Sequence, residues 1–171
     1  MNNLTKLSDG VYHLNEDYSV LTEDLIEFLK KDCLNNQKKR SRINFHRSSD
    51  SLVHEMIIAM HNTTEIDVHA HVNKSESFHL IEGDICIVLF KNNTSKELDR
   101  IYLSAKKQPS YYRMNADIYH LVIPISEITI IHETTQGPFK ANSSLIPSWT
   151  FSESGKAIVS SIRTQIQKEE N

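Results

Sequence analysis

Three histidines and one glutamate in this sequence have the types and the spacing of ligands for a metal ion. His69 and His71 occupy alternate positions, so on an extended strand both side chains project toward the same side. Glu76 follows after enough chain to bend and return, and His120 lies in an apolar run far away in the sequence. Imidazole and carboxylate ligands suit Zn, Fe, Mn, Co or Ni. The pattern therefore predicts one divalent metal ion held by His69, His71, Glu76 and His120.

An ion held in this way could bind a substrate, because an octahedral ion with four protein ligands has open coordination positions. Gly83 follows Glu82 and precedes Asp84, where a hairpin turn needs a positive φ. A strand, a loop, a strand and a turn are thus expected after His69. The alternative is that the histidines are ordinary polar residues near strand ends, but their joint spacing with Glu76 and Gly83 favours the metal.

A second group of polar residues precedes the histidines. Arg42, Asn44 and His46 alternate onto one strand face, where they offer a cation, an amide and an imidazole to an anionic or hydroxyl-rich ligand such as a sugar or sugar nucleotide. The alternative is an edge strand whose polar side faces water. Tyr112 is a further candidate for ligand binding, since a phenol beside the ion can serve acid/base chemistry, although aromatic residues on strands more commonly belong to the core.

The remaining polar candidates are weaker, and no residue is assigned as catalytic. His79 comes three residues after Glu76, which places it on the opposite face of a regular strand and predicts that it is not a ligand. His132 and Glu133 precede a loop containing Gly-Pro, where a structural use is favoured. The sequence has no Ser/His/Asp order, Gly-rich phosphate loop or Cys-x-x-Cys pair to indicate a nucleophilic hydrolase or a nucleotide fold.

The elements that would position these residues are mostly strands. Apolar spacing, a capping Thr22 and acidic first-turn residues predict a helix over residues 22–34, and residues 154–170 have the spacing of a C-terminal helix. Between them lies a period-two stretch around residues 41–45, followed by β-type runs at 53–60, 64–69, 77–82, 85–90, 100–103, 111–114, 118–123 and 127–133. Short strands with no helices between them predict a mainly β antiparallel sandwich or barrel.

Length and composition limit the function classes. The 171 residues suit a single domain over 1–171, with an N-terminal arm and helix at 1–39, a barrel at 40–150 and a C-terminal helix and tail at 151–171. A net charge of −3 does not indicate nucleic acid as a partner. The sequence shows no apolar run that indicates a membrane span or signal peptide, so a cytoplasmic protein is expected. The arm before Thr22 is available for a homodimer contact.

The metal residues resemble those of a known family. The pattern His69-x-His71-x4-Glu76-x6-Gly83 is similar to the first cupin motif after its leading glycine, and His120 falls where the second motif supplies its histidine. The second motif departs from the family, because Asn115 and Asp117 stand in place of Pro and Gly, and Pro124 in place of Asn. The resemblance implies a double-stranded β-helix of jelly-roll type.

A narrower resemblance covers most of the chain, from the helix before Arg40 to about Trp149. The segments that carry it are similar to those of WbuC-type cupin-fold metalloproteins, which are associated with O-antigen and other surface-polysaccharide gene clusters; they are Arg42-x-Asn44-x-His46-Arg47-Ser48, Lys74-Ser75-Glu76, His132 to Phe139 and Ile146 to Trp149. This resemblance implies a metal-binding cupin with a carbohydrate ligand.

Three functional hypotheses follow. The first is a metal-dependent cupin that acts on or binds a carbohydrate intermediate of surface-polysaccharide synthesis, with the ion as Lewis acid for isomerisation, epimerisation or lyase chemistry. An iron-bound form would permit oxygenase chemistry. The second is a non-enzymatic, metal-loaded module that binds or senses a ligand. The third is a metal-free sugar-nucleotide isomerase or epimerase in which histidines act as bases.

Overall fold

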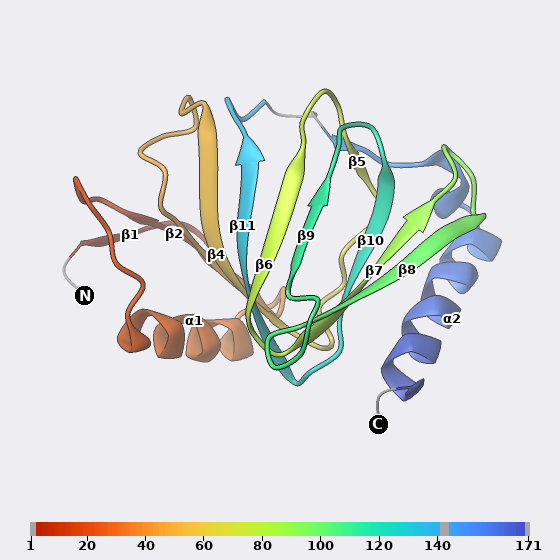
Figure 1. Cartoon of the computed structure of the whole chain (residues 1–171), viewed down its shortest axis with the longest axis horizontal. Coiled ribbons are helices and arrows are strands. Elements are labelled where there is room, and N and C mark those ends of the chain that lie inside the picture. The colour runs from red at the N-terminus through yellow and green to blue at the C-terminus, as the bar shows by residue number, and fades with distance from the viewer. Residues whose placement is uncertain (1–2, 141–143, 170–171) are drawn as a thin grey trace.

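Two sheets, antiparallel except for one parallel pair, face each other across an apolar interior in the computed structural model, which describes residues 3–140 and 144–169 (Figure 1). The larger sheet has seven strands in the order β1 (Leu4–Ser8), β2 (Val11–Leu14), β3 (Arg40–Asn44), β4 (Val53–His61), β11 (Ile128–Gln136), β6 (Glu76–Glu82) and β9 (Tyr111–Met114). The smaller sheet has the order β10 (Tyr119–Pro124), β7 (Asp84–Phe90) and β8 (Glu97–Ser104). Two residues of β5 (Ala70–His71) pair with β12 (Ser144–Leu145).

Alternation along these strands decides which side chains fill the space between the sheets. The interior cluster takes large apolar residues from both sheets, among them Met56, Ile58, Phe78, Leu80, Ile85, Ile87 and Val122. Successive strand residues face opposite sides, so the other face of each sheet also presents apolar residues that need cover. The two helices provide it.

Helix α1 (Glu23–Asn35) covers the outer face of the larger sheet (Figure 1). The Thr22 hydroxyl accepts a hydrogen bond from the Leu25 N–H at 3.4 Å, and acidic residues in the first turn favour the helix N-terminus. Leu25, Leu29 and Cys33 are buried against residues of β3 and β4 such as Ile43 and Ile57. The predicted N-terminal helix is therefore confirmed, with Thr22 as its cap.

Helix α2 (Glu153–Glu169) covers the smaller sheet in the same way (Figure 1). It follows a short 3-10 helix, η1 (Ser148–Phe151), and buries Ile162 and Ile166 against Val88 and Leu121. The predicted C-terminal helix is thus confirmed. Among the described residues, no helix combines the length and the apolar character that crossing a bilayer requires.

The N-terminal residues belong to the larger sheet rather than to a separate arm. β1 pairs with β2, and β2 lies parallel to β3, with Val11 opposite Arg42 and His13 opposite Asn44. Consequently β3 has a strand on each side, β2 and β4. The alternative that the segment of Arg42 and Asn44 forms an edge strand is therefore wrong. It arose because β1 and β2 were not recognised as strands in the sequence.

One predicted strand, at 64–69, is absent from the structure. Residues 64–68 run without strand pairing, and only His69 makes an isolated bridge. Side chains satisfy this backbone instead. The Arg163 guanidinium on α2 donates to the carbonyl oxygens of Thr64 and Ile66, and the Thr64 hydroxyl donates to the Lys39 carbonyl. A helix side chain thus takes the place of a neighbouring strand.

The turn at Gly83 has the predicted geometry. Gly83 joins β6 to β7 with φ +78°, and a Cβ there would lie 2.7 Å from the Ile128 carbonyl oxygen. Only glycine combines this φ with so close an approach of backbone. Glu76 is therefore at the start of a strand whose other end is fixed by a tight turn.

Candidate metal centre and its cavity

Backbone pairing brings the three predicted histidines together from distant parts of the chain. His69 and His120 form a bridge in which the His69 N–H donates to the His120 carbonyl at 3.0 Å and the His120 N–H donates back at 2.8 Å. His71 lies two residues further on, in β5. His69 and His71 therefore present their rings on the same side as His120 on β10.

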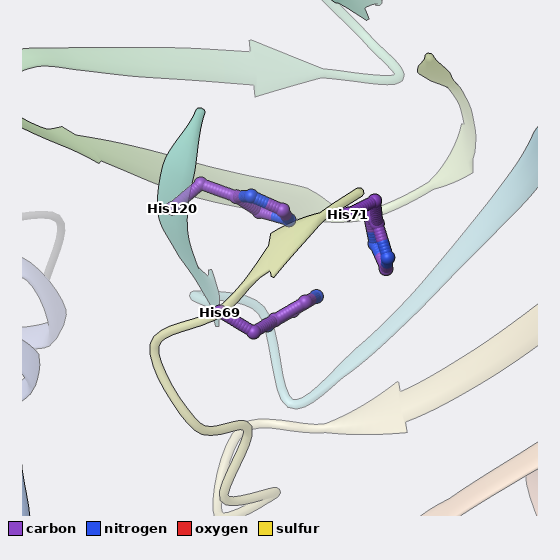
Figure 2. A group of neighbouring side chains, drawn as sticks. All are labelled: His69, His71 and His120. Carbon is purple, nitrogen blue, oxygen red and sulfur yellow. The ribbon is translucent and has the colours of Figure 1, made fainter. Parts of the chain in front are cut away.

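The three rings converge on one point (Figure 2). Each offers a nitrogen within 4.8 Å of the other two. The Nδ1 atoms of His69 and His120 contact the carbonyl oxygens of Asp67 (2.8 Å) and Ile118 (3.1 Å). A carbonyl only accepts, so each Nδ1 carries the proton and Nε2 keeps its lone pair. These contacts orient the rings as ligands of a metal are oriented in proteins.

Glu76, the first residue of β6, closes the group. Its Oε2 lies 2.9 Å from the His71 Nε2, and its Oε1 lies 3.4 Å from the His120 Nε2. The residue is 3% exposed. Burial by itself raises the pKa of this carboxyl, but His120 and His71 outweigh it and hold the pKa at about 2. Glu76 is therefore an anion at neutral pH.

The histidines differ in protonation. Burial, with the charge of His120, lowers the pKa of His69 to about 4, so its imidazole is neutral at pH 7. Burial also lowers the pKa of His71, but Glu76 has the larger combined effect and raises it above the ordinary value.

The three histidines form a group that could hold a metal ion, and Glu76 lies beside two of them. The His71 Nε2, His120 Nε2 and Glu76 Oε1 are buried without a hydrogen bond of acceptable geometry, even though the ion-pair distances are short. Buried polar atoms are normally satisfied, and a metal is one of the explanations for a cluster of exceptions. Nitrogen and oxygen donors in this ratio suit Zn, Fe, Mn, Co or Ni.

A cavity of about 570 Å³ opens beside the histidines. His69 and His71 form part of its wall, and the predicted ligand-binding residues Arg42, Asn44 and His46 form another part. Strand register explains the second group. His13, Asn44, Met56, Glu133 and Phe78 are partners in one row across β2, β3, β4, β11 and β6, so their side chains share a face of the sheet. The structure thus brings these predicted residues to the same cavity as the histidines.

Three other residues considered from the sequence lie elsewhere. Tyr112 is 9% exposed, packs in the interior cluster with its ring centroid 6.2 Å from that of Phe78, and is not part of the cavity wall. Burial and the negative Glu76 raise its pKa to about 12. His79 is exposed on the outer face of β6, as the alternation predicts. His132 also lies on that face, with its Nε2 3.7 Å from Glu55.

Glu133, for which the sequence favoured a structural use, lies at the candidate site. Its side chain lies on the cavity wall, and it makes no side-chain hydrogen bond or ion pair with the described residues. Burial, with the negative charge of Glu76, raises the pKa of Glu133 to about 8, although Arg42, His71 and Arg40 act in the opposite direction. A carboxyl that exchanges its proton near neutral pH is suited to acid/base chemistry. The sequence did contain a signal for this position: on a strand, Glu133 alternates onto the same face as Ile131 and Thr135.

Comparisons with known proteins identify the fold but no activity. A family model described as a domain of unknown function (DUF6016) matches residues 21–103. No curated protein matches the chain. Among solved structures, CapF with the inhibitor 3-isopropenyl-tropolone is similar at TM-score 0.55 and 15% identity, over 64% of this chain and 32% of that one.

Two further solved structures are similar to this chain. The capsular polysaccharide assembling protein CapF from Staphylococcus aureus matches at TM-score 0.53 and 16% identity, over 62% of this chain and 29% of its own. A cupin superfamily protein from Desulfitobacterium hafniense matches at TM-score 0.45 and 9% identity, over 57% of this chain and 76% of its own. This chain spans about a third of the length of the CapF chains. The mainly β architecture of this chain is the cupin jelly roll.

Proposed function

We propose that this protein is a metal-dependent cupin that binds and transforms a small polar ligand, a sugar or sugar nucleotide, in the cavity beside His69 and His71. The observation that carries the proposal is the convergence of three imidazoles and the Glu76 carboxylate, two members of which, His69 and His71, line that cavity. His69, His71, Glu76 and His120 would hold one divalent ion, and the ion would supply Lewis-acid polarisation of a ligand oxygen.

The residues around the ion site have separate roles in this proposal. Asn44 and His46 offer hydrogen bonds to hydroxyl groups, and Arg42 offers a cation. Glu133 faces the same space and is the candidate to give or take a proton, since its pKa is raised to about 8 by burial. This carboxyl favours an enzyme over a module that only binds its ligand, because a binding module has no need of a proton carrier.

A carbohydrate context has two supports. The segments around Arg42, Glu76 and His132 resemble those of WbuC-type proteins of surface-polysaccharide gene clusters. Independently, one similar structure bears the description of a capsular polysaccharide assembling protein. We infer that the ligand derives from the same chemistry, a sugar or nucleotide sugar on the way to a surface polymer, which would place the protein in the cytoplasm.

Metal content after dialysis is the first test. His71→Ala should lower the bound metal to a small fraction of the wild-type amount, because it removes one of four ligands, whereas His79→Ala should retain it. The two histidines belong to strands that are consecutive in the sequence, β5 and β6. The His71 ring faces the cluster and the His79 ring faces the solvent, so His79→Ala is a matched control. Elemental analysis by mass spectrometry gives the ratio, and circular dichroism confirms folding. Equal metal content in both variants would contradict the ligand assignment.

Turnover decides between the enzyme and the alternatives. Protein loaded separately with Zn, Fe, Mn or Ni is incubated with candidate nucleotide sugars, and products are followed by NMR. Product that requires the metal and is lost in Glu133→Gln supports the proposal. Saturable binding without product would identify a binding module, and activity that survives a chelator would identify a metal-free isomerase.

A further inference from the structure

Two arginines on one strand face the cavity. Arg40 and Arg42 alternate along β3, so their side chains leave the sheet on the same side, and both form part of the cavity wall. Each is half-buried. At Arg42, β2 and β4 pair with β3 on its two sides, so this residue does not lie at a sheet edge.

Neither of these two charges has an ion-pair partner among the residues that the structure describes, although Glu133 and Asp67 act on Arg40 from a greater distance. Neither guanidinium makes an ion pair or a side-chain hydrogen bond with the described residues, and the Arg42 Nε is buried without any partner. Burial lowers the pKa of Arg40, and the neighbouring charge of Arg42 lowers it further. A buried cation without a partner is costly, and two beside each other are more so. Such an arrangement persists where a ligand supplies the missing negative charge.

The other ionisable groups on the cavity wall do not remove this excess. Lys74 adds a cation, whose Nζ donates to the Pro138 carbonyl at 2.7 Å, and His13, His46 and His54 also form part of the wall. Glu133 is the one acidic residue among the described wall residues. The wall thus carries three basic side chains, Arg40, Arg42 and Lys74, against a single acidic one.

We propose that Arg40 and Arg42 bind an oxyanion of the ligand, a carboxylate or a phosphate, while the rest of the ligand extends toward His69 and His71. This inference rests on the proposed function, from which it takes the metal site that would bind the other end of the ligand. It narrows the substrate class to sugar acids or sugar phosphates. Both pairs of residues lie on the wall of one cavity, so the proposal requires a ligand long enough to contact both. Guanidinium groups suit the planar carboxylate and the phosphate through paired hydrogen bonds.

Calorimetry with three probes tests the class of ligand. Glucuronate, glucose 1-phosphate and glucose share a sugar ring and differ in charge. We expect at least one charged probe to bind the full-length protein roughly 10- to 100-fold more tightly than glucose, the range expected for hydrogen bonds to charged groups. Preference for glucuronate identifies a sugar acid, and preference for glucose 1-phosphate identifies a phosphate ester. Equal affinity for all three, or no binding of either charged probe, overturns the proposal.

Two variants separate binding from folding. Arg42→Met should abolish the preference for the charged probe and at the same time raise the melting temperature, because it removes an uncompensated buried charge while keeping the apolar stem. Arg40→Met should weaken binding in the same direction. The control is Arg47→Gln, since Arg47 is exposed, pairs with Asp17 and lies outside this cavity wall. An equal loss of affinity in Arg47→Gln would mean nonspecific attraction and would contradict the site.

Measuring probe binding on chelator-treated protein makes the test of the oxyanion site independent of the metal. If the charged probe binds wild-type protein in the presence of EDTA and binding is lost in Arg42→Met, the oxyanion site stands even if the protein takes up no ion. If metal content is normal but the charged probe binds no better than glucose, the oxyanion site is wrong and the metal centre stands.

Discussion

At the scale of single residues, Glu133 and Glu76 show how position decides the state of the same side chain. Both lie on the inner side of the larger sheet, in adjacent strands β11 and β6. Glu76 contacts two imidazoles and has a pKa of about 2, whereas Glu133 has no such partner and burial raises its pKa to about 8. Two carboxyls with divergent pKa values in one site commonly divide the acid and base roles.

The raised pKa of Glu133 predicts a pH-dependent stability. The ordinary pKa is 4.5, and the folded value is about 8. Between these values the folded state binds a proton that the unfolded state lacks, so the free energy of unfolding falls as pH rises, by at most about 1.4 kcal/mol per pH unit. Glu133→Gln should flatten this slope and increase stability at pH 8. Urea denaturation of EDTA-treated protein at pH 5, 6.5 and 8 measures it; an unchanged slope would refute the assignment.

At the scale of elements, helix α2 supports the metal site through a segment that has no strand pairing. Arg163 donates to the carbonyl oxygens of Thr64 and Ile66, and three residues later His69 begins the bridge to His120. The guanidinium is mostly buried, which lowers its pKa. The position of His69 therefore depends on a helix that packs on the opposite side of the small sheet.

Arg163→Met should weaken the support of the segment that precedes His69. Residues 64–68 would lose their side-chain donors, so we expect faster hydrogen exchange there and a metal affinity lower by roughly tenfold, the lower end for partners that orient ligands. Lys156→Met on the exposed side of the same helix is the control. Exchange rates measured by mass spectrometry and metal titration would show both effects, and unaltered exchange in Arg163→Met would count against this role.

At the scale of the whole molecule, the candidate centre joins parts of the chain that are distant in sequence. His69 and His71 precede β6, Glu76 begins it, and His120 lies on β10 of the other sheet. An ion bound to all four would connect the two sheets of the jelly roll. Metal binding is then part of the stability of the fold, since the unfolded chain has no preformed site.

Removal of the metal should therefore lower the melting temperature. A ligand at 100 times its dissociation constant stabilises the folded state by about 2.7 kcal/mol. Wild-type protein should melt at a lower temperature in EDTA than with added Zn, whereas His71→Ala should melt at the same temperature in both. Differential scanning calorimetry gives the comparison. If added Zn raised the melting temperature of His71→Ala as much as that of the wild type, the ion would bind at another site.

The sequence by itself determined the features that depend on local spacing. Alternation put His69 and His71 on one side, Gly83 marked the turn, and amphipathic spacing with the Thr22 cap defined α1. These follow from the fixed periods of strand and helix. The first cupin motif could be recognised for the same reason, because its residues lie close together in the sequence.

The tertiary structure decided which strands are neighbours, and with it the contents of the cavity. Nothing local indicates that β2 pairs with β3, or that Glu133 on β11 shares a row with Asn44. Arg40 and Glu133 are ordinary charged residues in the sequence, and they become cavity residues only through the register of distant strands. Burial and charge then follow from that register, which is why neither their exposure nor the pKa of Glu133 was available from the sequence.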